Sequence, residues 1–73
     1  MPYQIANYTG AEARARAAYL CPGATPMPAD VIERMDRLTI HGSSFSDPGD
    51  DWCEFRAFDA LGTEIAYQRV NGY

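Results

Sequence analysis

Catalytic residue types are sparse in this sequence, and the only stretch that gathers several of them is HGSSFSDPGDD, residues 41–51. His41 is the only histidine, and in an extended strand it would share a face with Ser43, two residues further on. A hydrolytic site needs a nucleophile, a base and a third group that orients the base, and no G-x-S-x-G elbow surrounds Ser43 or Ser44. We therefore expect no catalytic residue and no enzymatic activity.

Three aspartates of the same stretch, Asp47, Asp50 and Asp51, suggest a calcium site, because hard cations bind several carboxylate oxygens. Their spacing is not that of an EF-hand loop. Aspartates in turns also commonly accept hydrogen bonds from local backbone amides. The sequence therefore predicts no metal ion and no cofactor in this stretch.

Cys21 and Cys53 are the only cysteines, and together with His41 they show none of the paired spacings of zinc ligands. Two cysteines in 73 residues are too few for a secreted disulfide scaffold, and the N-terminus lacks a charged segment followed by an apolar one. We therefore expect two reduced thiols in a cytoplasmic protein.

The formal net charge is −4, with ten acidic residues against six basic ones, all of which are arginine. No basic stripe is available to neutralise phosphates, so direct binding to nucleic acid or to an anionic membrane is not expected. No apolar run approaches the roughly 20 residues of a transmembrane helix. The 47% hydrophobic content nevertheless suits a globular protein, and a chain of this length predicts one small domain, residues 1–73.

Two helices are expected before the middle of the chain. Thr9 and Glu12 have the spacing of a capping box, which predicts a helix over residues 10–20. A second helix is predicted over roughly residues 28–37, because apolar residues follow the spacing of a buried stripe. The residues of that stripe are Val31, Ile32, Met35 and Leu38.

Three extended segments follow: LTIHGSSFS, DWCEFRAF and TEIAYQRV. The short joints DPGD and ALG predict that they pair antiparallel in sequence order. The alternation in residues 3–8 predicts a short strand or an extended arm in addition. The predicted fold class is thus α+β, with two helices packed on one face of a three-stranded antiparallel sheet.

The turn DALGTE predicts the register of the last hairpin, because Gly62 can take the left-handed conformation after a type I turn. With Asp59 opposite Thr63, Phe55 would lie opposite Tyr67 on the core face of the sheet. The residues expected on the other, outward face are Trp52, Glu54, Arg56, Phe58 and Gln68.

Trp, Phe and Arg on an outward face are residue types that dominate binding energy at protein interfaces. Asp50 and Asp51 would form an acidic rim beside them, which would attract a basic partner. The predicted partner-binding residues are therefore Trp52, Glu54, Arg56, Phe58, Gln68, Asp50 and Asp51. In the alternative interpretation this face is solvated surface, on which Trp52 covers Val70 and Phe45 and Arg56 pairs with Glu54 or Glu64.

In length, composition and helix-plus-hairpin plan, the whole chain resembles the small acidic proteins of phages and mobile elements, among them the anti-CRISPR proteins. The resemblance implies a protein that binds and inhibits a bacterial protein target, such as a CRISPR–Cas effector, in the host cytoplasm, without catalysis or a cofactor. Two alternatives remain: a small non-catalytic regulatory adaptor that forms homodimers through the exposed sheet, and a minimal enzyme that uses His41, for which so thin a fold offers little pocket volume.

Overall fold

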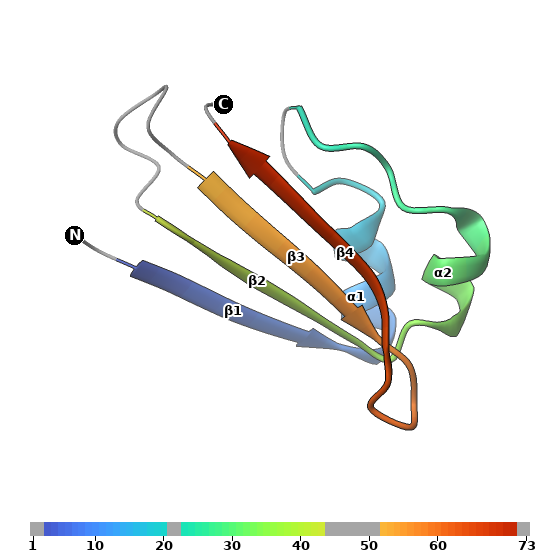
Figure 1. Ribbon diagram of the computed structural model, residues 1–73. Coiled ribbons are helices and arrows are strands. Elements are labelled where there is room, and N and C mark those ends of the chain that lie inside the picture. The colour runs from blue at the N-terminus through green and yellow to red at the C-terminus, as the bar shows by residue number, and fades with distance from the viewer. Residues whose placement is uncertain (1–2, 21–22, 44–51, 72–73) are drawn as a thin grey trace.

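A computed structural model describes residues 3–20, 23–43 and 52–71, which form a four-stranded antiparallel sheet and two short helices (Figure 1). The helices lie on one face of the sheet. Along the chain the elements are β1 (Tyr3–Thr9), α1 (Gly10–Ala17), α2 (Ala29–Arg34), β2 (Arg37–Ser43), β3 (Trp52–Phe58) and β4 (Glu64–Asn71).

The α+β class is confirmed, whereas the prediction of a three-stranded sheet is wrong. β1 pairs with β2 from Tyr3 opposite Ser43 to Thr9 opposite Arg37, so the sheet has four strands in the order β1-β2-β3-β4. Side-chain packing stabilises β1 in addition to its backbone pairing, because Ala6 and Tyr8 pack against the core. The N-terminal segment is therefore part of the sheet and not a loose arm.

The start of α1 is stabilised by the backbone and not by the predicted capping box. Thr9 occupies the N-cap position, but its side chain makes no capping hydrogen bond. Instead Gly10 has a φ of +56°, and its amide donates to the carbonyl of Asp36 at 2.8 Å. A positive φ of this kind is readily adopted only by glycine. Gly10 thus turns the chain out of β1 and into the helix.

The second helix is shorter than predicted, because it ends at Arg34. Met35 is extended, with φ −68° and ψ 128°, and Arg37 already begins β2. The apolar stripe continues past the helix end, since Met35 and Leu38 are both buried although neither is helical. Arg37, predicted near the C-terminus of this helix, is therefore a strand residue.

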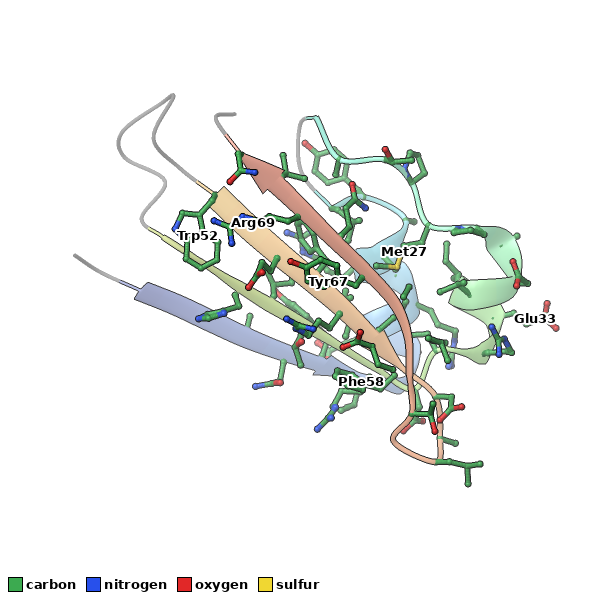
Figure 2. All side chains as sticks on the ribbon, viewed as in Figure 1. Met27, Glu33, Trp52, Phe58, Tyr67 and Arg69 are labelled. Atoms are coloured by element: carbon green, nitrogen blue, oxygen red, sulfur yellow. The ribbon has the colours of Figure 1, made fainter. Side chains whose placement is uncertain are left out.

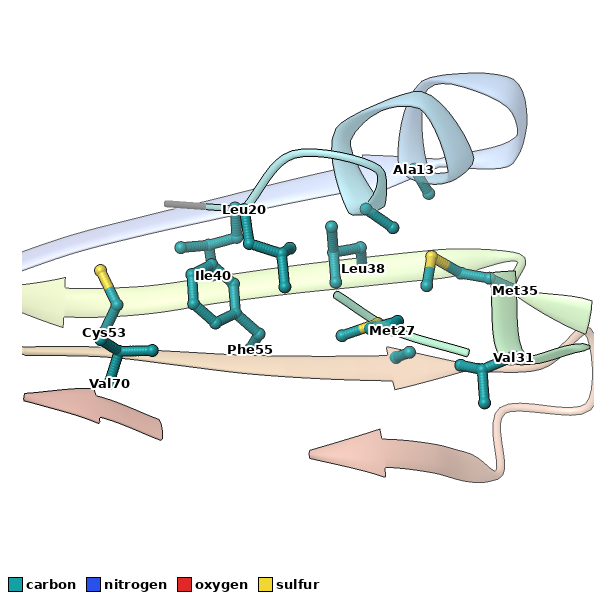
Figure 3. Close-up of a cluster of buried hydrophobic side chains, with 12 residues drawn as sticks. Ala13, Leu20, Met27, Val31, Met35, Leu38, Ile40, Cys53, Phe55 and Val70 are labelled. Carbon is teal, nitrogen blue, oxygen red and sulfur yellow. The ribbon is translucent and has the colours of Figure 1, made fainter. Parts of the chain in front are cut away.

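The core lies between the two helices and the inner face of the sheet (Figure 3). Phe55 is the largest fully buried side chain, with 1% of its surface exposed. Ala13 and Ala17 of α1 are completely buried, and their small side chains allow the helix to approach the sheet closely. The buried hydrophobic residues of the described chain are Ala13, Ala17, Leu20, Met27, Val31, Met35, Leu38, Ile40, Cys53, Phe55, Ala57 and Val70.

The turn of the last hairpin is as predicted, but the register beyond it is not. Gly62 has a φ of +84°, the Asp59 amide donates to the Thr63 carbonyl at 3.0 Å, and Phe58 lies opposite Glu64. A β-bulge then follows, so that Ala57 pairs with Ala66, and Ile65 is the extra residue of β4. Every later pair of this hairpin is shifted by one residue from the predicted register.

This shift exchanges the two faces of β4, because successive side chains in a strand point to opposite sides. Tyr67 was expected in the core opposite Phe55, but it lies opposite Arg56 and is 48% exposed. Gln68 was expected on the outward face, but it lies opposite Phe55 and bonds to the backbone of Thr25. The predicted place of Gln68 among the outward residues is therefore wrong.

The two edges of the sheet differ. β1 contains no charged residue and pairs with β2 without a register shift. β4 contains a bulge and the charged residues Glu64 and Arg69. The segment 23–28 also runs beside β4 (Figure 1), and the Gln68 amide holds it by accepting from the Thr25 amide at 2.6 Å and donating to the Thr25 carbonyl at 2.8 Å. Features of this kind limit pairing with further strands, and within the described residues they are found at β4 and not at β1.

Candidate functional site

The face of the sheet opposite the helices carries a cluster of arginine and aromatic side chains. β3 alternates strictly, with Cys53, Phe55 and Ala57 buried and the residues between them partly exposed. Figure 2 shows Trp52, Arg69, Tyr67 and Phe58 following one another along β3 and β4. We call this surface the open face; it comprises Arg37, Thr39, His41, Trp52, Glu54, Arg56, Phe58, Glu64, Tyr67, Arg69 and Asn71.

Three guanidinium groups of the open face lie over aromatic rings. Their Cζ atoms are 4.4 to 4.6 Å from the ring centroids in the pairs Arg37 with Phe58, Arg56 with Tyr67, and Arg69 with Trp52. Each pair joins two neighbouring strands, and in the first two the partners are directly opposite each other in the register. Exposed cation–π contacts contribute only about 0.5–1 kcal/mol each, so their effect here is mainly to order the side chains.

Glu54 is the polar centre of this surface. Its carboxylate accepts a hydrogen bond from the Tyr67 hydroxyl at 2.5 Å and another from Arg69 at 3.4 Å, and it lies 3.6 Å from Nδ1 of His41. The Tyr67 hydrogen bond is the largest cause that lowers the pKa of Glu54 below its ordinary value, and the charges of Arg69 and Arg56 act in the same direction. The same hydrogen bond raises the pKa of Tyr67. Glu54 is therefore an ionised acceptor at neutral pH.

A second carboxylate pairs with the middle arginine. Arg56 Nη1 donates to Glu64 Oε1 at 3.0 Å, and this hydrogen bond raises the pKa of Arg56. The alternative interpretation of a solvated face required such a pair, and the pair is present. Val70, which that alternative placed under Trp52, lies on the core side of β4. The other expected contact of Trp52, with Phe45, falls outside the described residues.

The Glu54 hydrogen bond predicts a pH dependence of stability. Because the folded-state pKa of Glu54 is lowered, its carboxylate stabilises the fold above the unfolded-state pKa, and this stabilisation is lost as pH falls through the folded-state pKa. The difference in unfolding free energy between the parent and Glu54→Gln should therefore shrink as pH falls below about 4.5. Urea unfolding at a series of pH values measures this difference, with Glu33→Gln on α2 as the control. A difference that grows on acidification would contradict the hydrogen bond.

The other chemical candidates are not assembled into a site by the described part of the chain. The His41 ring contacts Trp52 edge to face, with centroids 5.4 Å apart. Among residues 3–20, 23–43 and 52–71, no three His, Cys, Asp or Glu side chains could hold a metal ion. Cys53 is buried, with 2% of its surface exposed. The remaining candidates Ser44, Asp47, Asp50, Asp51 and Cys21 lie outside the described residues.

Four of the seven predicted partner-binding residues lie together on the open face: Trp52, Glu54, Arg56 and Phe58. Gln68 is on the opposite side, and Asp50 and Asp51 lie outside the described residues. The sequence interpretation missed Tyr67, Arg69 and Arg37. A signal was present for Arg69, because the predicted register placed its charge on the core face, where an unpaired charge is costly.

A crevice of about 540 Å³ lies next to the open face, between β4 and the segment 23–28. It is lined by residues such as Thr25, Met27, Gln68 and Val70, together with Tyr67 and Arg69 at the margin of the open face. Among the described residues, this lining contains no nucleophile beside a general base. The crevice offers space for contact beside the open face.

No family model matches the sequence, and neither the curated proteins nor the solved structures contain a significant match to the chain. No helix in the described ranges is long and apolar enough to cross a membrane. The open face combines aromatic rings, arginine side chains ordered by stacking, and two carboxylates that accept hydrogen bonds, a composition suited to binding.

Proposed function

We propose that this chain is a non-catalytic protein-binding module that acts by covering a site on a protein target with its open face. The observation that supports this proposal is the set of three arginine–aromatic stacks on one exposed side of the sheet. Trp, Tyr and Arg are the residue types most enriched among those that dominate binding energy at interfaces.

The order of these side chains favours binding. A flexible side chain that becomes fixed in an interface costs about 0.5–1.5 kcal/mol of entropy, and the stacks already restrict these arginines before a partner arrives. A cation–π contact also strengthens to about 2 kcal/mol or more when water is removed from it. The stacks therefore contribute little to the free protein and more to a complex.

The target we propose is a bacterial protein, such as a CRISPR–Cas effector, whose activity is blocked when the open face covers its working surface. This target class comes from the resemblance to small acidic phage proteins. Inhibition by occupancy requires neither a cofactor nor a catalytic group, which suits a chain of 73 residues with a thin core.

A homodimeric regulatory adaptor is the second candidate, and the uncharged edge strand β1 favours it. Pairing of β1 with β1 of another copy would bring together two strands without charged side chains, so no like charges would repel each other. The dependence of molecular mass on protein concentration distinguishes this candidate from a monomeric inhibitor.

The proposal is tested by capturing a target from bacterial lysate and measuring its binding to variants. Trp52→Ala and Arg56→Ala should each raise Kd about 30-fold, or about 2 kcal/mol, mainly through faster dissociation. Tyr19→Ala is the control, because Tyr19 is an aromatic residue that is 69% exposed and lies outside the open face. Unchanged dissociation in folded Trp52→Ala and Arg56→Ala variants would show that the open face is not the binding surface.

A further inference from the structure

The three stacked arginines of the open face are not equivalent. Arg56 lies over the ring of Tyr67, and its Nη1 is 3.0 Å from a carboxylate oxygen of Glu64. Arg69 lies over the ring of Trp52, and its Nη1 is 3.4 Å from a carboxylate oxygen of Glu54. Two of the three stacks are thus completed by a carboxylate from the protein itself.

The third stack lacks this component. The Cζ atom of Arg37 lies 4.4 Å from the centroid of the Phe58 ring. Among the described residues, however, Arg37 makes no ion pair and no side-chain hydrogen bond. Two acidic side chains of the adjoining β3–β4 hairpin are already engaged. The Asp59 carboxylate accepts from the amides of Leu61 and Thr63, at 2.9 and 3.0 Å, and Glu64 accepts from Arg56.

We infer that Arg37, held over Phe58 without a carboxylate of its own, is the site at which the partner protein places an acidic side chain. This inference rests on the proposed function and deepens it by assigning a charge to the partner. A guanidinium whose face covers a ring still presents its edge, and that edge carries N–H donors in the fork geometry that binds a carboxylate with two hydrogen bonds.

The charge balance of the open face supports the proposal that the partner places an acidic side chain at Arg37. Among the described residues, this face carries three arginines against two glutamates, and both glutamates are already paired. The remaining positive charge is at Arg37, so electrostatic complementarity favours an anion at this point. The expectation of a basic partner came from Asp50 and Asp51, which lie outside the described residues.

A carboxylate is favoured over the phosphates of a nucleic acid. Binding to nucleic acid depends on several lysine or arginine side chains that neutralise successive phosphates. Within the described part of the chain, the open face has one arginine without a carboxylate, and the whole chain carries a net charge of −4. A single site of this kind suits one aspartate or glutamate of a folded partner.

The first test uses acetate as the probe and does not depend on the target. Sodium acetate added to ¹⁵N-labelled protein at constant ionic strength should shift the Nε–Hε resonance of Arg37 saturably, and those of Arg56 and Arg69 much less. Arg34 on α2 is the control, because it is exposed and already lies near Asp30. Equal shifts of all these arginines, no shift at Arg37, or a larger response to phosphate than to acetate would overturn the inference.

The second test uses the protein captured by the open face. Arg37→Ala should raise its Kd about tenfold, Arg37→Lys should recover only part of this loss, and Arg34→Ala, which removes the same charge, should change Kd less than twofold. If Trp52→Ala and Arg56→Ala weaken binding but Arg37→Ala does not, the inference about Arg37 fails while the proposed function stands. If none of the three weakens binding, the proposed function fails too.

Discussion

Phe55→Ala is expected to lower the free energy of unfolding by about 3–5 kcal/mol, the range measured for removing a buried aromatic side chain. Phe55 is 1% exposed and lies at the centre of the core between the sheet and the helices (Figure 3). A domain this small has little stability in reserve, so much of the variant should be unfolded at 37 °C. Urea unfolding followed by circular dichroism measures the loss.

Phe58→Ala provides the matched control, because Phe58 is the same residue type on the same strand but lies on the open face. Its removal should cost clearly less than the removal of Phe55, since it leaves no cavity in the core. Equal losses for the two variants would mean that the two faces of β3 are assigned the wrong way round.

Gly42→Val is expected to destabilise the protein by about 3 kcal/mol, because β2 and β3 are too close at this point for a side chain. A Cβ atom on Gly42 would lie 2.5 Å from the carbonyl oxygen of Trp52 and 3.1 Å from the sulfur of Cys53. The nearer atom belongs to the backbone of a paired strand, so it cannot rotate out of the way. The two strands must therefore separate locally to admit the valine.

Thermal unfolding of Gly42→Val, alone and combined with Cys53→Ala, tests this explanation. Removing the sulfur should not restore the melting temperature, because the closest contact is with the Trp52 carbonyl. Full rescue by Cys53→Ala would assign the steric conflict to the sulfur instead. A Gly42→Val variant as stable as the parent would contradict the close approach of the strands.

The faces of β3 were predictable from the periodicity of the sequence, whereas those of β4 were not. WCEFRAF places buried and exposed residues in strict alternation, and the structure follows it. In EIAYQRV, both sets of alternate residues contain an apolar side chain, so periodicity alone does not select a face. The bulge at Ile65 sets which residues of β4 face the core, and both Ile65 and Ala66 pack against the core beside it.

The other errors also arise where tertiary contacts override local patterns. The stripe of apolar residues predicted a helix as far as residue 37, yet Met35 reaches the core from an extended backbone. β1 belongs to the sheet because it meets β2, from which it is separated by residues 10–36. A pairing partner so distant in the chain leaves no mark in a local pattern. Arg37 and its stack on Phe58 were missed for the same reason.

The difference between the two sheet edges limits how this protein could polymerise. A fibril that grows by strand addition needs two open edges on every copy, so that each one can accept a neighbour on both sides. Among the described residues, β1 has neither a bulge nor a charged side chain, whereas β4 has both and is flanked by the segment 23–28. Two copies joined through β1 would present a bulged and charged β4 at each end. Addition of further native copies by strand pairing would therefore be disfavoured beyond two subunits.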